Sequence, residues 1–286
     1  MEYIYFQGKL VKKDSKDISF LDRGILYGEG LFETLRVYNG EAFLLDKHIA
    51  RLKKGCSVLG INCDTDDLST GGIRSVIDAN NIVEGSLRIT VTGGGKKGLL
   101  PAPDSKCTYF ITGKPGSPYS PEHYSKGYKG LISSIKRNPY SPLTYLKSLN
   151  FLENILAKKE AYDAGYDEAI FLNVKNFLTE GSITNLFIIK DGEVLTPDEK
   201  CGLLPGITRE VVIDICNKNK IPVKEKSNLS LSDLISADEA FLTNSLIEIM
   251  PLVKINKHLI NNDRPGSLTK RLSILYKDYI KICSSP

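Results

Sequence analysis

The 286-residue sequence lacks tryptophan and holds only two methionines and three histidines. The histidines are dispersed, so a histidine-based metal centre has no support. The six cysteines are also far apart and none forms a CxxC pair with another, which argues against a zinc site or a disulfide framework and predicts reduced thiols in a cytoplasmic protein. No apolar run reaches the roughly 18 residues that cross a bilayer. The first ten residues lack the apolar core of a signal peptide.

The sequence also lacks a large excess of positive or negative charge. The sequence has 38 basic and 34 acidic residues, a net charge of +4 and a pI near 8.5, and the basic residues are scattered. This balance predicts neither a nucleic-acid partner nor a membrane surface, and leaves small molecules as the expected partners. Hydrophobic residues make up 41% and charged residues 25%, as in ordinary globular proteins. The length favours two compact units.

Turn and periodicity signals divide the chain into two mixed α/β (α+β) domains. A hairpin around Asn39-Gly40, followed by a helix for which Asp46 is the expected N-cap, belongs to a small first domain over residues 1–115. Residues 116–126 are rich in proline and serine and are the expected linker. A larger second domain, over residues 127–286, contains alternating strand and helix patterns, with a helical apolar stripe that ends near Gly165.

Lys147 is the first candidate for chemistry. It falls between an extended, proline-containing segment and an apolar helix, a junction from which a lysine can point into a cleft. A lysine buried among apolar groups loses proton affinity, and its neutral amine is then a nucleophile for carbonyl groups. The alternative is a solvated lysine on a loop, which is the commoner environment for an isolated lysine.

Three further stretches place polar residues at strained or glycine-flanked positions. Glu180 interrupts a strand-like run beside a glycine, where it either faces a ligand nitrogen or lies exposed on a hairpin turn. Ile207 and Thr208 follow Pro205-Gly206 at a helix start, which is either an anion site or a common proline-led helix start. Asn244 and Ser245 end a buried strand, where they bind an anion or simply form a turn.

Taken in order, these stretches resemble one family, the pyridoxal-phosphate enzymes of fold type IV. That family includes branched-chain and D-amino-acid aminotransferases and aminodeoxychorismate lyase. The resemblance covers nearly the whole chain and rests on six segments in register: Asp22–Arg36, His48–Leu52, Lys147–Asn150, Thr179–Ser182, Leu204–Arg209 and Asn244–Pro251.

The resemblance implies a role for each candidate. Lys147 would hold pyridoxal phosphate as an imine and move a proton at the substrate carbon. Glu180 would pair with the pyridine nitrogen and keep it protonated. The cofactor phosphate would be bound by Arg51, Ile207, Thr208 and Ser245. Residues expected to shape the substrate side are Tyr27, Phe32, Arg36, Arg88 and Asn244. The resemblance also implies a homodimer, with the site between the two domains and near the subunit interface.

Two reactions remain open within the family. A lyase would release pyruvate and 4-aminobenzoate from 4-amino-4-deoxychorismate, a reaction of folate biosynthesis, whereas an aminotransferase would move an amino group to a 2-keto acid. Thr34, which stands where branched-chain enzymes usually have glycine and could donate a proton to the departing group, favours the lyase. The lyase is also favoured by Phe151, which stands in place of the usual tyrosine, and by the Asn244–Pro251 stretch.

Two further observations bear on the assignment. The segment Thr92–Gly95 lacks the arginine of the Thr-Arg-Gly pattern found in many lyases and D-amino-acid aminotransferases, and Arg88 or Lys96 is the candidate substitute for binding a substrate carboxylate. A non-catalytic binding protein on the same fold is the alternative of a different class. The joint presence of Lys147 and Glu180 argues against it, because such a protein has no chemical need for both.

Overall fold

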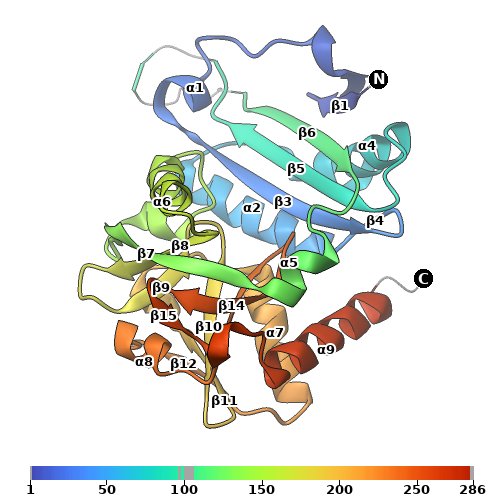
Figure 1. Ribbon diagram of the computed structural model, residues 1–286. Coiled ribbons are helices and arrows are strands. Elements are labelled where there is room, and N and C mark those ends of the chain that lie inside the picture. Colours follow the sequence, from blue (N-terminus) through green and yellow to red (C-terminus); the bar gives the residue numbers. More distant parts are fainter. Residues whose placement is uncertain (1, 96–97, 100–105, 284–286) are drawn as a thin grey trace. The chain divides into compact units, whose positions relative to one another are not determined.

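The chain forms two compact units (Figure 1) in a computed structural model that describes residues 2–95, 98–99 and 106–283. The first unit contains the described residues up to Pro118, together with Leu146–Asn150 and Cys283. The second contains Tyr119–Tyr145 and Phe151–Ile282. The short segment that carries Lys147 therefore belongs to the first unit, although it follows the expected linker in the sequence.

The first unit is built on a six-stranded antiparallel sheet of order β2-β1-β6-β5-β3-β4. The predicted hairpin turn at Asn39-Gly40 is confirmed, because both residues take positive φ values, 51° and 80°, between β3 and β4. The strands are β1 (Tyr3–Phe6), β2 (Lys9–Lys12), β3 (Gly30–Tyr38), β4 (Glu41–Ala42), β5 (Gly85–Thr92) and β6 (Thr108–Pro115).

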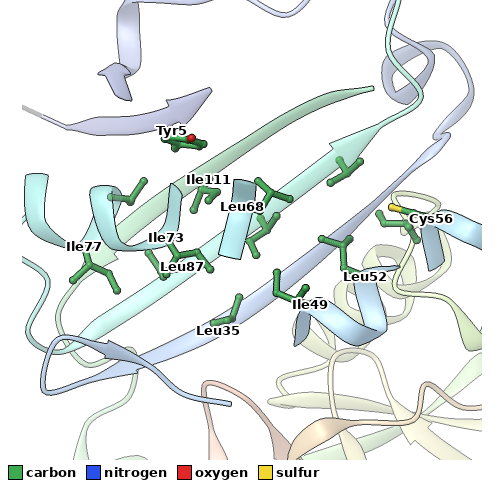
Figure 2. Close-up of a cluster of buried hydrophobic side chains, with 14 of the residues drawn as sticks. Tyr5, Leu35, Ile49, Leu52, Cys56, Leu68, Ile73, Ile77, Leu87 and Ile111 are labelled. Carbon is green, nitrogen blue, oxygen red and sulfur yellow. The ribbon is translucent and has the colours of Figure 1, made fainter. Parts of the chain in front are cut away.

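Helices cover one face of this sheet and close a hydrophobic core over it (Figure 2). Leu35 of β3 and Leu87 of β5 meet Ile49 and Leu52 of α2 in that core, which removes their apolar surface from water. The helical segments are α1 (Arg23–Tyr27), α2 (Leu45–Leu59), α3 (Thr65–Asp67), a π-helical turn (Leu68–Gly72) and α4 (Ile73–Ala79); a 3₁₀ turn (Lys13–Ser15) follows β2.

The expected N-cap of α2 is wrong by two positions. The cap residue is Leu44, whose left-handed backbone (φ 52°) turns the chain out of β4 and whose side chain makes no cap hydrogen bond. The helix therefore begins at Leu45, and Asp46 lies within its first turn, where its negative charge still complements the helix dipole.

The second unit is built on a nine-stranded mixed sheet of order β12-β11-β10-β13-β14-β7-β8-β9, with β15 paired to β14. Strand β9 also pairs with β10, so the strands between them in this order form a closed circuit. The strands are β7 (Tyr128–Arg137), β8 (Glu168–Asn173), β9 (Leu178–Gly181), β10 (Asn185–Lys190), β11 (Glu193–Pro197), β12 (Val223–Lys226), β13 (Glu239–Asn244), β14 (Glu248–Ile255) and β15 (His258–Leu259).

Helices of the second unit follow the turn signals closely, since α7 begins directly after Pro205-Gly206. The expected linker, 116–126, contains a helix, α5, which starts on a proline at its first turn. The helices are α5 (Pro121–Lys126), α6 (Leu152–Asp163), α7 (Ile207–Lys218), α8 (Leu231–Ile235) and α9 (Ser267–Cys283), and the 3₁₀ turns are Pro142–Tyr145, Glu199–Cys201 and Asn261–Asp263. No helix in the described part of the chain is both long and apolar enough to span a membrane.

The apolar stripe of α6 faces solvent within this chain. Ala157 and Ala161 pack inward against Ala169 and Phe171, and their small size lets the helix lie close to the sheet. The larger apolar residues of the helix, among them Leu152 and Ile155, remain exposed. The helix thus has two apolar faces, and only the face with Ala157 and Ala161 is buried within this chain.

Candidate active site

Lys147 is fixed in place by backbone pairing with the edge of β3. The N–H of Phe32 donates to the carbonyl of Lys147 over 2.9 Å, and the N–H of Leu149 donates to the carbonyl of Gly30 over 2.9 Å. Leu31 and Ser148 form the isolated bridge between these two hydrogen bonds. The candidate lysine thus lies on a short extended segment, immediately before α6, as its sequence context predicts.

One face of β3 gathers Lys147 and two of the expected substrate residues. The Nζ atom of Lys147 lies 4.3 Å from the centroid of the Phe32 ring, and the guanidinium carbon of Arg88 lies 3.9 Å from the same centroid. Thr34 is on this face because it follows Phe32 by two positions, and it pairs directly with Arg88 across β3 and β5. An amine and a guanidinium therefore approach one aromatic ring, which is favourable for both cations, and a threonine lies on the same face of the strand.

A buried hydroxyl belongs to the same face. Thr90 pairs directly with Phe32 across β3 and β5. Its Oγ1 atom is buried and has no hydrogen-bond partner among the described residues. An unpaired buried hydroxyl is costly, and such groups are enriched where a ligand supplies the missing partner.

The other expected substrate residues of the first unit have structural contacts. Arg36 is buried, and it donates to the carbonyl of Gly85 over 2.8 Å and to the carboxylate of Glu84 over 3.0 Å. Tyr27 ends α1, with its ring half-exposed and 5.2 Å from the guanidinium carbon of Arg23. Arg36 therefore anchors the far end of β3, away from the ring of Phe32. Lys96, the alternative carboxylate-binding residue, lies outside the described residues.

The opposite face of β3 holds Arg51 through a buried carboxylate that the sequence analysis did not select. The Nε and Nη2 atoms of Arg51 each donate to the carboxylate of Glu33 over 2.7 Å, which is a bidentate pair. His48 Nδ1 lies 2.7 Å from the same carboxylate. Glu33 of β3 thus orients the guanidinium of Arg51, which is expected to bind phosphate. His48, on the same helix as Arg51, contacts Glu33 in turn.

The electrostatics of Glu33 and His48 follow from their burial, their hydrogen bonds and the charges around them. Burial alone would raise the pKa of Glu33, but the hydrogen bonds and charge of Arg51, helped by His48, outweigh it and lower the pKa to about 2. Burial lowers the pKa of His48, and the charges of Arg51 and Lys147 add to that effect, although its hydrogen bond to Glu33 acts in the other direction. Near neutral pH the group therefore holds an ionised Glu33 and a neutral His48.

Glu180 is the corresponding buried carboxylate of the second unit. It lies on β9, where the sequence left an exposed hairpin turn as the alternative, and the structure buries it. The N–H of Leu204 donates to its Oε2 atom over 3.0 Å, and Arg137 Nη2 lies 3.2 Å from its Oε1 atom. Arg137 is itself buried, with its guanidinium carbon 4.1 Å from the Phe171 centroid. A cation and a backbone N–H both favour the ionised carboxylate.

A second buried carboxylate fixes the turn that follows Glu180. Glu168 is fully buried and accepts hydrogen bonds from the N–H and hydroxyl of Ser182 and from the hydroxyl of Thr184. Gly181 is required there, because a Cβ atom would lie only 2.1 Å from Thr184 Oγ1. The backbone on both sides of Glu180 is consequently held in one conformation.

The first turn of α7 offers backbone donors. Its N-cap, Gly206, has no side chain to accept hydrogen bonds from the N–H groups of Ile207 and Thr208. The approach to this helix is fixed by Asn185, whose amide donates to the carbonyl of Leu204 over 2.9 Å. A Cβ on Gly206 would lie 2.0 Å from Asn185 Oδ1, so the close approach needs glycine. Such a helix start is suited to an anion.

Asn244 and Ser245 occupy the turn between β13 and β14. Asn244 Oδ1 accepts from the N–H groups of Leu246 and Ile247 over 2.8 and 2.9 Å, and its amide donates to the carbonyl of Ile183 over 3.0 Å. These contacts give Asn244 the role of holding the turn. Ser245 follows it and is half-buried. Thr243, before it, has a buried hydroxyl without a hydrogen-bond partner among the described residues.

Several residues of these groups escaped the sequence analysis, among them Glu33, Arg137 and Thr243. Glu33 left a signal, since it is the one charged residue among the apolar positions of β3 that face α2. Arg137 left none, because only the fold brings it to Glu180. Thr243 belongs to the small polar run that was recognised, but nothing in the sequence distinguishes its hydroxyl from its neighbours.

Comparison with known proteins identifies the class. The family model of class IV amino-transferases matches residues 30–255, and the chain belongs to this family of pyridoxal-phosphate enzymes. It is 38% identical over 278 residues, 96% of this chain and 95% of the relative, to a Methanocaldococcus jannaschii protein provisionally named a branched-chain-amino-acid aminotransferase. It is 34% identical over 289 residues, 97% of this chain and 94% of the relative, to the aminodeoxychorismate lyase of Bacillus subtilis.

The fold agrees with this membership. The branched-chain amino acid aminotransferase of Escherichia coli superposes with a TM-score of 0.89 at 29% identity, covering 95% of this chain and 92% of that one. The predicted fold class, a two-domain mixed α/β enzyme of fold type IV, is therefore confirmed, and so are the predicted family and cofactor.

The residues described above fit the cofactor. Its phosphate is a dianion, which suits Arg51, an uncapped helix start and the hydroxyl residues Thr243 and Ser245 at the end of β13. Its pyridine nitrogen suits a buried ionised carboxylate such as Glu180, and its aldehyde suits an amine on a fixed backbone, such as that of Lys147.

Proposed function

We propose that this enzyme is a 4-amino-4-deoxychorismate lyase, acting in folate biosynthesis through Lys147. The observation that supports this most is one face of β3 and β5. There the amine of Lys147 and the guanidinium of Arg88 approach the ring of Phe32, and the side chains of Thr34 and Thr90 share that face of the sheet. A branched aliphatic side chain would leave the buried hydroxyl of Thr90 without a partner, whereas a substrate with carboxylate groups supplies an acceptor for it and a counter-charge for Arg88.

Each residue has a distinct task in this proposal. Pyridoxal phosphate, when bound, supplies a ring that accepts electrons from the bond broken beside the substrate amino group. Lys147 holds the cofactor and moves a proton at the carbon that carries that amino group. Glu180 holds a proton at the pyridine nitrogen, and Arg137 positions Glu180. Thr34 donates a proton to the departing pyruvate group, and Arg88 binds a substrate carboxylate.

Several residues share phosphate binding in this proposal. Arg51, held by Glu33, supplies the cation. Ile207 and Thr208 supply backbone N–H groups at the start of α7, and Thr208 and Ser245 supply hydroxyls. Asn244 acts by fixing the turn that presents Ser245.

The test is pyruvate release from 4-amino-4-deoxychorismate by purified, cofactor-loaded protein without any keto acid. The proposal predicts repeated turnover that Lys147→Ala abolishes. Thr34→Val is expected to slow turnover on the order of 100-fold, because it removes the proton donor but keeps the shape, while Thr34→Ser retains activity. Absence of pyruvate from a protein with bound cofactor would contradict the lyase assignment.

The second candidate is an aminotransferase for branched-chain or D-amino acids. It is favoured by the 38% identity to the Methanocaldococcus jannaschii relative, which exceeds the identity to the lyase. This candidate predicts amino-group transfer to a 2-keto acid, with Thr34→Val affecting that reaction little. A protein that performs neither reaction would be the non-catalytic member of the fold.

We also propose that the enzyme is a homodimer in the cytoplasm. The exposed apolar residues support association, because Ile25 of α1 is 60% exposed and Leu152 and Ile155 of α6 are 65% and 56% exposed. Ile155→Lys is expected to yield monomers in analytical ultracentrifugation. Ile274→Lys on α9, an isoleucine of similar exposure (64%), is the matched control and is expected to leave the assembly unchanged.

A further inference from the structure

Two neighbouring side chains of the second unit hold one loop residue, Leu204, from both of its backbone groups. Glu180 of β9 pairs directly with Asn185 of β10, so their side chains lie on the same face. The N–H of Leu204 donates to the Oε2 atom of Glu180 over 3.0 Å, and the amide of Asn185 donates to the carbonyl of Leu204 over 2.9 Å. The loop before α7 is thus attached to the base of the β9–β10 hairpin by two hydrogen bonds.

A bulge in β9 brings Glu180 to this face. Where β9 pairs with β8, it has one residue more than its partner over the same stretch. Leu178 packs in the hydrophobic core with Leu186, and in a regular strand Glu180 would share the face of Leu178. The extra residue instead turns Glu180 to the side of Asn185, which alternates with Leu186 and therefore lies on the opposite face.

The hairpin leaves these two side chains little freedom. The N–H of Gly181 donates to the carbonyl of Thr184 over 2.6 Å and closes the turn between them. Glu180 and Asn185 are each only 6% exposed. Asn185 also meets the loop at a second point, because a Cβ atom on Gly206 would lie 2.0 Å from its Oδ1 atom. Gly206 is the residue directly before α7, so Asn185 contacts the approach to this helix twice.

Leu204 therefore links two parts of the proposed cofactor site. Its N–H binds the carboxylate assigned to the pyridine nitrogen, and α7, assigned to the phosphate, begins three positions later at Ile207. Pyridoxal phosphate carries its ring nitrogen and its phosphate on one small planar group. The carboxylate and the helix start must consequently keep one separation if they are to bind both ends together.

We propose that Asn185 is a positioning residue that sets the separation between the carboxylate of Glu180 and the first turn of α7. The proposal rests on the cofactor roles assigned above to Glu180 and α7, and it holds for a lyase or an aminotransferase alike. Without the amide donor, the carbonyl of Leu204 loses its partner and the loop shifts. Glu180 then loses an N–H that favours its ionised form, and the N–H groups of Ile207 and Thr208 are displaced from the phosphate.

The experiment uses Asn185→Leu, which keeps a similar shape, adds no charge and removes the amide. Fluorescence titration, after removal of the cofactor, compares pyridoxal phosphate with pyridoxal, which lacks the phosphate. Affinity for pyridoxal phosphate is expected to fall on the order of 10-fold, and affinity for pyridoxal less, because only the first ligand uses both ends. The ¹⁵N signal of ring-labelled cofactor is expected to move toward that of an unprotonated nitrogen. Equal losses for both ligands with an unmoved signal would overturn the proposal.

Asn173→Leu is the matched control for a structural effect. Asn173 is also a buried asparagine, and its amide donates over 3.0 Å to the carbonyl of Cys201, three positions before Leu204. The control is expected to lower the melting temperature, as Asn185→Leu does, while leaving the ratio of the two affinities and the nitrogen signal unchanged. If it moved either readout as far as Asn185→Leu, the specific role of Asn185 would be refuted.

Gly206→Ala probes the same contact with the amide still in place. Its Cβ atom collides with Asn185 Oδ1, so this variant is expected to weaken the binding of pyridoxal phosphate. Asn185→Ala makes room for that Cβ, and the double variant should therefore bind no more weakly than Asn185→Ala alone. Additive losses in the double variant would contradict the proposal.

Glu180→Gln separates this proposal from the assignment on which it rests. A nitrogen that is unprotonated in Glu180→Gln but unchanged in Asn185→Leu would overturn the positioning role of Asn185 alone. A nitrogen that stays protonated in both variants would overturn the role of Glu180 as well.

Discussion

The two units each place one glutamate at the centre of their candidate groups, and the two carboxylates are held differently. Glu33 takes two hydrogen bonds from Arg51 and one contact from His48, all from side chains of a single helix. Glu180 takes one backbone N–H from Leu204 and one contact from Arg137, which lies on another strand. The first arrangement fixes a cation, and the second fixes a carboxylate.

In our proposal, this difference corresponds to different roles for the two carboxylates. Both oxygens of Glu33 accept hydrogen bonds from Arg51, so the charge of Glu33 is neutralised locally, and in our proposal this pairing orients the guanidinium for the cofactor phosphate. Glu180 is fixed by backbone and by a buried arginine, and in our proposal it holds the proton at the pyridine nitrogen. In our proposal, similar burial and charge thus serve two purposes, positioning for Glu33 and catalysis for Glu180.

Glu180→Gln gives the largest expected effect. Because glutamine cannot hold a proton at the pyridine nitrogen as an ionised carboxylate does, kcat should fall on the order of 10²–10⁴-fold, with cofactor affinity changed much less. Steady-state kinetics with saturating cofactor measure this loss. The comparison would break if Glu33→Gln lowered kcat by the same factor under the same conditions.

Glu33→Gln should instead act on binding and stability. Loss of the bidentate partner leaves Arg51 poorly oriented, so cofactor affinity should fall on the order of 10–100-fold, as for other residues that orient a direct ligand. A broken buried pair also costs about 3 kcal/mol of unfolding free energy. Fluorescence titration and urea denaturation measure the two effects. A variant with wild-type affinity would remove Arg51 from the phosphate site.

Acid should destabilise the first unit through the same pair. The pKa of Glu33 is about 2 in the fold, below its ordinary value of 4.5, so its contribution is complete above pH 4.5 and is lost as the pH falls toward 2. His48 acts in the same direction at higher pH, because its lowered pKa makes the unfolded state bind the proton first as the pH falls below 6.5. Urea denaturation from pH 7 to 3 should show this decline, and Glu33→Gln should flatten its lower part. A slope that is the same in Glu33→Gln as in the wild type would contradict the assigned pairing of Glu33 with Arg51.

Arg137→Met is the smallest of the expected changes. It removes a positioning contact but leaves the Leu204 N–H on Glu180, so kcat should fall about 10-fold. Arg137→Lys, which keeps the charge and loses the planar fork, should recover part of the loss. Full activity of Arg137→Met would show that the backbone alone positions Glu180.

Several features of the fold could be predicted from the sequence because the residues at its turns favour particular backbone conformations. Asn39-Gly40 and Pro205-Gly206 mark a hairpin and a helix start that the structure contains. Asp46 was misplaced as a cap because Leu44 takes a left-handed conformation that its side chain does not favour. The pairing of Leu146–Asn150 with β3 was not accessible, since it joins segments that only the complete fold brings together.

Some residues of the candidate site could likewise be selected from the sequence, and others could not. Lys147 and Glu180 were selected as candidates because the motifs around them occur in the order of a known family. Glu33 and Arg137 were missed because their importance comes from side-chain contacts across strands and helices rather than from local sequence. Arg36 was selected for its place in a motif, and the structure gives it contacts that anchor β3.

The division of roles between the two carboxylates can be measured at the cofactor itself. The ¹⁵N chemical shift of pyridoxal phosphate labelled at the ring nitrogen reports whether that nitrogen is protonated when bound. The account predicts a protonated nitrogen in the wild type and in Glu33→Gln, and an unprotonated nitrogen in Glu180→Gln. A nitrogen that stays protonated in Glu180→Gln, or loses its proton in Glu33→Gln, would contradict the account.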